Sequence, residues 1–418
     1  LHANGGAVFF YSCVVLILNP TFEQGNVYVQ DGIDSSTLRL VYDKTAAGND
    51  GAGAVDPQMS PDGRLVAFVK DGEIFVSPVE LSSSGASQAV GGGSASSGTL
   101  LLSPPVQLTF GGSSSGVTHG LADFVAQEEM DRYRGFWWSL DSSSIAFTEV
   151  DERHIPSFRI MHQGKDSVGE GAQEDHHYPF AGKANPKVRL AVVQVDVAAI
   201  ESGRSMTSQE NFRPVWMDIG GGGSSGGGKC QSANGGSSMT GAVASATAES
   251  STLNAQRTTS TTEGEIYLAR VNWLQDGSLC AQVQNRAQTE LRLLRLDPGS
   301  GTPTVLVVER SKVWINLHHL LRSLPSPAPQ QPPDKTPNNG RGNTSGMDLS
   351  PSPSSSASQQ HQQQPDGSFY FIWASERSGY MHLYLYQYVP GADRALEVRQ
   401  ITTGEWVVES VVGVDQVR

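Results

Sequence analysis

Residues 60–76 read SPDGRLVAFVKDGEIFV, and this stretch decides the fold class. Leu65, Ala67 and Val69 alternate with two further apolar residues, which is typical of a short strand. Asp71-Gly72 follows, a dipeptide that favours a two-residue hairpin turn, and a second apolar run covers 74–76. The segment therefore predicts two antiparallel strands joined by a tight turn.

Related segments recur along the chain at 139–152, 274–296 and 365–386, and all four contain an aspartate in a predicted turn. These aspartates are separated by 79, 135 and 90 residues, in the order Asp62, Asp141, Asp276 and Asp366. If the low-complexity tracts 220–263 and 322–364 are not counted, the spacings become about 79, 91 and 47 residues. These spacings are close to multiples of the length of a four-stranded blade. The repeats predict an all-β fold, a β-propeller. We also expect Gln107-Leu108-Thr109 and Gln400-Ile401-Thr402 to be matching strand ends.

The predicted domain organisation has two parts, residues 1–20 and a propeller over 21–418. Three tracts rich in Ser, Gly, Pro or Gln interrupt the propeller as disordered loops, because they cannot bury enough apolar surface to fold; they cover 81–103, 220–263 and 322–364. Within the first part, residues 7–18 form an apolar run that is too short to cross a bilayer. We interpret this run as a buried strand pair, and a truncated signal-anchor is the alternative.

The composition excludes some classes of function. The net charge of −13 and the pI near 5.2 argue against nucleic acid as a partner, because binding phosphates requires clustered Lys and Arg. The three cysteines, Cys13, Cys230 and Cys280, lie far apart and have no metal or redox spacing. So few cysteines slightly favour the cytoplasm. A membrane-anchored or secreted protein stays an open alternative.

Two kinds of motif are interpreted as carrying no chemistry. The strings 112–116 and 222–226 match G-x-S-x-G, but both lie in Ser/Gly tracts without the strand and helix that a nucleophile elbow needs. The pairs 176–177 and 318–319 are adjacent histidines, which point to opposite faces of a strand and so cannot clamp one metal ion. We interpret these histidines as surface residues. No catalytic residue, metal or cofactor is predicted in this chain.

The stretch 126–138, AQEEMDRYRGFWW, contains the adjacent acids Glu128 and Glu129. If 121–134 is a helix, residues 121, 124 and 125 form an apolar stripe whose next positions are these two acids. One interpretation is a salt-bridged face, since Glu128 stands four residues before Arg132. The other is a clamp for an ammonium group, in which Arg132 orients the two carboxylates.

Several segments together resemble the N-terminal β-propeller of the dipeptidyl-peptidase IV family of prolyl-oligopeptidase-type serine peptidases. The most specific are GLADFVAQEEMDRYRGFWWS (120–139), YPFAGKANPKVRLAVVQVD (178–196) and ASERSGYMHLYLY (374–386). In that family paired glutamates hold the free N-terminal amine of a peptide, so that an X-Pro dipeptide is released. By this resemblance Glu128 and Glu129 bind the amine. Some members have a substrate-binding arginine where this chain has Gln107, so that role is not transferred.

The resemblance also implies partners that this chain lacks. An α/β-hydrolase domain with the catalytic Ser, Asp and His should follow the propeller, whereas the chain stops at Arg418. We therefore expect an incomplete propeller that selects substrate but does not cut it, and a full-length protein that can be a homodimer. Whether the parent protein is an enzyme stays open, because a non-catalytic propeller used as an interaction scaffold, or a pseudoenzyme, is the alternative.

Overall fold

The computed structural model describes residues 13–15, 25–30, 38–46, 52–79, 103–112, 116–162, 173–202, 212–220, 265–324 and 367–415. Strands dominate this part of the chain, and its two helices, α1 (Phe124–Met130) and α2 (Val197–Glu201), are short. The prediction of an all-β fold is confirmed.

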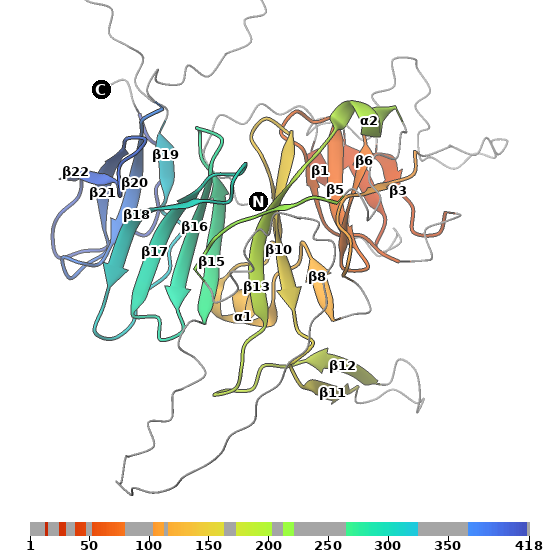
Figure 1. Cartoon of the computed structure of the whole chain (residues 1–418), viewed down its shortest axis with the longest axis horizontal. Helices are drawn as coiled ribbons and strands as arrows, with labels where there is room; N and C mark the ends of the chain where they lie inside the picture. Colours follow the sequence, from red (N-terminus) through yellow and green to blue (C-terminus); the bar gives the residue numbers. More distant parts are fainter. Residues whose placement is uncertain are drawn as a thin grey trace, which may run out of the picture.

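Within the described residues, five antiparallel sheets follow one another along the sequence, and a separate hairpin is inserted between two strands of the third sheet, β10 (Ser144–Asp151) and β13 (Lys187–Gln194) (Figure 1). The first sheet contains β1 (Cys13–Val15), β2 (Val27–Gln30) and β3 (Leu38–Tyr42). The second contains β4 (Val55–Met59), β5 (Leu65–Lys70), β6 (Glu73–Pro78) and β7 (Val106–Gln107). The third contains β8 (Val117–His119), β9 (Phe136–Trp138), β10 (Ser144–Asp151), β13 (Lys187–Gln194) and β14 (Val215–Trp216).

The remaining strands form the hairpin and two four-stranded sheets. The hairpin is β11 (Ser157–Met161) with β12 (Gln173–His177). The fourth sheet contains β15 (Ile266–Trp273), β16 (Leu279–Asn285), β17 (Glu290–Leu296) and β18 (Pro303–Arg310). The fifth contains β19 (Arg322–Leu324), β20 (Phe369–Ser375), β21 (His382–Tyr388) and β22 (Leu396–Gln400).

Consecutive sheets pack face to face, and each interface has its own apolar core. Each of these four interface cores draws buried side chains from two neighbouring sheets. From the first interface to the fourth, representative pairs are Val29 with Phe68, Val76 with Ile145, Val192 with Ala281, and Leu293 with Phe371. A series of small antiparallel sheets that bury both faces against their neighbours is the arrangement of propeller blades.

The hairpin predicted at Asp71-Gly72 is present. The two residues connect β5 to β6, and Lys70 pairs directly with Glu73. Both turn residues have positive φ, 51° for Asp71 and 73° for Gly72, as a type I′ turn requires. Glycine adopts this conformation without strain, which explains the dipeptide.

The turn aspartates of the repeats have equivalent structural roles. Asp62, Asp141 and Asp276 each accept a hydrogen bond from the backbone N–H two residues later, at 3.1 Å in all three. Asp366 lies outside the described residues. Each of the three therefore closes a turn that leads into a central strand of its sheet, which explains why the acid recurs.

The two predicted strand ends also match. Gln107 donates its side-chain amide to the carbonyl of Thr109 at 2.7 Å, and Gln400 donates to the carbonyl of Thr402 at 2.8 Å. Both segments follow the last strand of a sheet, β7 and β22. This is the repeat that the sequence predicts.

Other predictions fall mostly outside the described residues. Of the apolar run 7–18, the structure describes β1, which pairs with β2. The tracts 81–103, 220–263 and 322–364 contain only a few described residues. In the third tract these residues include β19, so strand structure begins where the sequence predicts a disordered loop. Within the described residues, no helix is long and apolar enough to cross a membrane.

Candidate functional site

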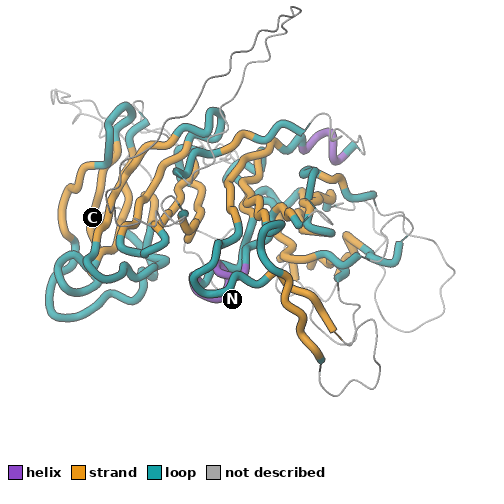
Figure 2. Tube along the Cα trace, turned by 60° about the horizontal axis from the view of Figure 1, so that its bottom comes forward, coloured by secondary structure: helices purple, strands orange, loops and turns teal. Residues whose placement is uncertain are grey.

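Helix α1 is part of a loop inserted into one edge of the third sheet. β8 and β9 pair with different halves of β10, and residues 120–135 leave the sheet between them. The base of this loop is closed by Leu121 bridging to Arg134 and by Thr148, whose hydroxyl donates to the carbonyls of Leu121 and Gly135. Figure 2 turns the lower end of the Figure 1 view, where α1 lies, toward the reader, and α1 lies near the middle of the molecule in that view.

Caps at both ends define a helix of only seven residues. Asp123 is the N-cap, and its carboxylate accepts the backbone N–H of Ala126 at 3.2 Å. Asp131 is the C-cap in the left-handed conformation, with φ of 53°. The next residue, Arg132, returns its backbone N–H to the carbonyl of Ala126 at 2.9 Å. The helix is therefore shorter than the 121–134 predicted from the sequence.

The predicted apolar stripe is wrong in its details. Ala126 and Met130 are the buried residues of α1, whereas Phe124 is 39% exposed and Leu121 lies before the helix. The reason is the cap at Asp123, because it starts the helix late and turns Ala126 and Met130 toward β15. Glu128 and Glu129 accordingly lie on the exposed side, and do not replace core residues.

The salt-bridged face is not formed either. Arg132 lies beyond the helix and is buried, and its guanidinium donates to Asp123 at 3.1 Å and to the carbonyl of Leu268 at 3.0 Å. Burial lowers the pKa of Arg132, and the charge of Asp123 opposes that effect. Within the described part of the chain, neither Glu128 nor Glu129 has a hydrogen bond or an ion pair. Arg132 therefore holds the helix as a whole and does not contact the two acids.

A second buried arginine, which the sequence analysis missed, supports the other end of α1. Arg270 of β15 donates to the carbonyl of Met130, and it lies 3.0 Å from Nε2 of His319. The same ring nitrogen is 3.2 Å from the carboxylate of Asp131. Burial and the nearby charge of Arg270 lower the pKa of His319, and the carboxylate of Asp131 opposes that effect. Two guanidinium groups thus lie beneath a helix whose exposed face is acidic.

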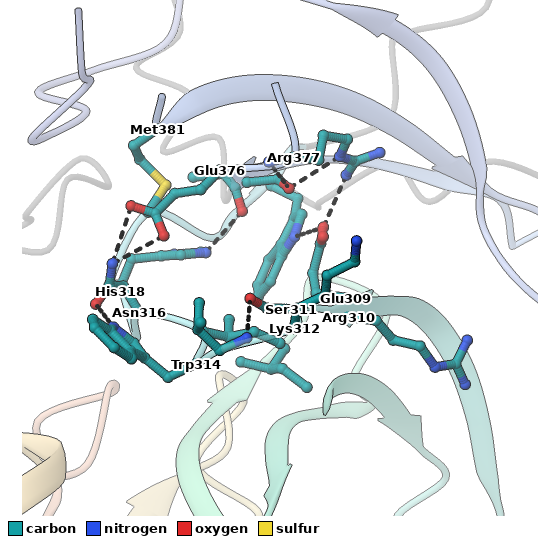
Figure 3. A pocket seen from close by; sticks show the side chains of 16 residues that line it. Glu309, Arg310, Ser311, Lys312, Trp314, Asn316, His318, Glu376, Arg377 and Met381 are labelled. Atoms are coloured by element: carbon teal, nitrogen blue, oxygen red, sulfur yellow. Dashed lines mark hydrogen bonds and ion pairs between the residues drawn. The ribbon is translucent and has the colours of Figure 1, made fainter. Parts of the chain in front are cut away.

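A cavity of about 380 Å³ lies beyond His319, between the fourth and fifth sheets (Figure 3). His318 forms part of its wall, its ring 4.4 Å from that of Trp373, and burial lowers its pKa to about 4. The interpretation of these histidines as surface residues therefore fits the exposed His319 better than it fits His318. Glu376 accepts two hydrogen bonds from Asn316 across the cavity. Glu128 and Glu129 are not among the residues that line it.

No metal centre is found in the described residues, where no group of three His, Cys, Asp or Glu side chains could hold an ion. Of the two G-x-S-x-G strings, 222–226 and the serines of 112–116 lie outside these residues. The chemistry that the described site offers is electrostatic: two adjacent, exposed carboxylates on a helix that buried arginines hold.

Comparison with known proteins assigns the family. The family model described as "Dipeptidyl peptidase IV (DPP IV) N-terminal region" matches residues 24–215 and 237–418. The chain belongs to this family. The resemblance inferred from the sequence is confirmed, and with it the dipeptidyl-peptidase context.

The relatives of this chain are distant in sequence. Mouse dipeptidyl peptidase 8 is 26% identical over an alignment of 237 residues, and the match covers 49% of this chain and 21% of the relative. Human prolyl endopeptidase FAP is 31% identical over 98 residues, 23% of this chain and 12% of the relative. The crystal structure of Porphyromonas gingivalis dipeptidyl peptidase 4 superposes with a TM-score of 0.52 at 18% identity, covering 94% of this chain and 37% of that one. This chain therefore spans well under half the length of these relatives.

Proposed function

We propose that this chain is the substrate-selecting propeller of a serine-type dipeptidyl aminopeptidase. Glu128 and Glu129 bind the N-terminal ammonium group of a peptide, so that cleavage by a hydrolase domain outside these residues releases an X-Pro dipeptide. The observation that supports the proposal is the state of the two acids. Both are exposed and have no hydrogen-bond or ion-pair partner among the described residues, yet their helix is held by Arg132 and Arg270.

The electrostatics of the site favour a cationic ligand. An ammonium group donates up to three hydrogen bonds, and each one to a carboxylate is charge-assisted. Two adjacent carboxylates therefore fix both the position and the direction of the amine. A helix held in place lowers the entropic cost of binding, because the ligand must order two side chains and not the backbone that carries them.

Peptide binding to the 418-residue chain tests the amine site. Gly-Pro-Ala should bind, and N-acetyl-Gly-Pro-Ala, which lacks the charge, should not. Glu128→Gln and Glu129→Gln should each weaken binding about 10- to 100-fold, the loss expected for one charge-assisted hydrogen bond. The exposed Glu405 provides a matched control, and Glu405→Gln should leave the affinity unchanged. Equal affinity for the free and acetylated peptides in an NMR titration would exclude the proposal.

An activity assay tests the role in catalysis. In a protein extended into the hydrolase domain, Glu128→Ala and Glu129→Ala should each remove most activity on a Gly-Pro chromogenic substrate. An unchanged kcat/KM in both variants would contradict the proposed role.

A non-catalytic interaction scaffold is the second candidate. One observation favours it, because β11 of the hairpin exposes apolar side chains, including Ile160 and Met161, to solvent. The sequence that follows Arg418 in the gene distinguishes the two functions. A hydrophobic strand, G-x-S-x-G and a helix would favour the enzyme, whereas a domain without the serine would favour the scaffold.

A further inference from the structure

Four aromatic rings form a cluster between α1 and the base of the β11–β12 hairpin. We call them the aromatic cluster: Phe124, Phe158, Tyr178 and Phe180. Phe124 lies 5.1 Å from Tyr178 between ring centroids, and Tyr178 lies 5.2 Å from Phe180. Phe158 is 6.2 Å from Tyr178. These separations are typical of interacting aromatic pairs.

The aromatic cluster is exposed although its members pack on one another. Each of the four side chains is between 38% and 48% exposed. Figure 1 shows α1 and the hairpin at the same end of the molecule, so the rings and the two glutamates share that end. Exposed apolar surface gathered in one place is typical of a binding site, because it is unfavourable in water.

The geometry of α1 places this apolar surface beside Glu128. Residues four apart on a helix are turned by about 40° from each other and lie one turn apart on the same face. Phe124 and Glu128 have this spacing, and helical side chains lean toward the N-terminus, so the carboxylate of Glu128 extends over the turn that carries Phe124. When the ammonium group of a ligand binds Glu128, the part of the ligand next to the ammonium group therefore lies against the aromatic cluster.

In a peptide, the group next to the ammonium is the side chain of the first residue. We propose that the aromatic cluster is a subsite for that side chain, and that the chain selects peptides whose first residue is apolar, aromatic residues above all. This inference rests on the proposed amine site at Glu128 and Glu129. Phe124 supplies the nearest ring and Tyr178 extends the surface. Phe158 of β11 and Phe180, which follows β12, pack against Tyr178.

Two peptides that differ only in the first side chain test the subsite. In titrations of the 418-residue chain, Phe-Pro-Ala should bind about tenfold more tightly than Gly-Pro-Ala, the ratio expected if about half of an aromatic side chain leaves water. Phe124→Ala and Tyr178→Ala should each reduce that ratio to near one. Tyr380→Ala is the matched control, since Tyr380 is 40% exposed in a turn of the fifth sheet, and it should keep the ratio.

The outcomes separate this inference from the proposed function. If both peptides bind equally, or if both variants retain the preference, the subsite is wrong while the amine site stands. If neither peptide binds, the amine site fails, and the subsite with it. Tyr178 lies outside α1, so Tyr178→Ala leaves the helix caps intact and serves if Phe124→Ala does not fold. A dimer that Tyr178→Ala abolishes, without any peptide preference, would assign the rings to self-association and would also overturn the proposal.

Discussion

At the scale of single residues, Arg132 determines where the candidate site lies. Its guanidinium joins the N-cap Asp123 to the carbonyl of Leu268 on β15, so one buried side chain ties the start of α1 to the fourth sheet. A buried ion pair is costly to break, because the remaining partner is left charged and unpaired.

Arg132→Met should therefore destabilise the protein strongly, by about 3–5 kcal/mol, because it leaves the Asp123 carboxylate buried without its partner. Chemical denaturation of the 418-residue chain measures this loss. Lys187→Met provides the control, since Lys187 is exposed at the start of β13, and it should change the free energy of unfolding by less than about 0.5 kcal/mol. Equal stability of the two variants would show that Arg132 does not hold the helix.

The residues of the site were only partly predictable. The motif pointed to Glu128 and Glu129 through the family resemblance, and family membership is now established. The apolar stripe gave the wrong buried face, because a cap at Asp123 decides where the helix starts and periodicity does not. The partners of Arg132 could not be read either, since Leu268 lies 136 residues away in the sequence.

At the scale of elements, strands and turns followed from local chemistry. The Asp71-Gly72 dipeptide and the turn aspartates have the conformations that their side chains favour. The insertion of α1 between β8 and β9 was not predictable, because it depends on two separate segments sharing one edge of β10. Gly135 makes this insertion possible. A Cβ there would lie 2.4 Å from backbone atoms of Gly120 and Leu121.

Gly135→Ala should therefore force the two ends of the loop apart and destabilise the protein by about 1–3 kcal/mol, as overpacking does. It should also weaken binding of Gly-Pro-Ala, because α1 is displaced. Gly413→Ala is the control, since a Cβ at Gly413 meets nothing within 4 Å. Thermal unfolding and peptide titration of both variants measure the two effects. A fully stable Gly135→Ala protein would contradict the tight closure of the loop.

At the scale of the whole molecule, the sheets are joined by apolar cores and, at one interface, by a buried polar cluster. His119 of β8 lies between two carboxylates, 2.8 Å from Glu73 of the second sheet and 3.1 Å from Glu149 of its own sheet. Its side chain is 2% exposed. The spacing of the repeats predicted successive sheets, but this junction depends on residues that are 46 and 30 positions away from His119.

The junction makes stability depend on pH. Burial alone would lower the pKa of His119, but hydrogen bonds and charges from Glu149 and Glu73 together outweigh it and raise the pKa to about 9. In the unfolded chain the pKa is about 6.5. Because the pKa of His119 is higher in the folded protein than in the unfolded chain, protonation of His119 stabilises the fold. This stabilisation is complete below about pH 6.5 and is lost as the pH rises toward 9. A difference of this size corresponds to about 3 kcal/mol.

Wild-type protein should accordingly lose up to about 3 kcal/mol of unfolding free energy between pH 6 and pH 9.5, in a window set by His119. His119→Gln, which cannot carry the charge, should be less stable at pH 6 and should show a flatter profile over the same range. Denaturant unfolding at a series of pH values measures both curves. His382 offers a matched control, because it is buried but lies between the hydroxyl of Thr402 and the carbonyl of Gly404, and no carboxylate of the described residues is bonded to it. In His382→Gln, the unfolding free energy should change with pH as it does in the wild type. If the unfolding free energies of wild type and His119→Gln instead changed in parallel with pH, the junction of the two sheets would not depend on a charged histidine.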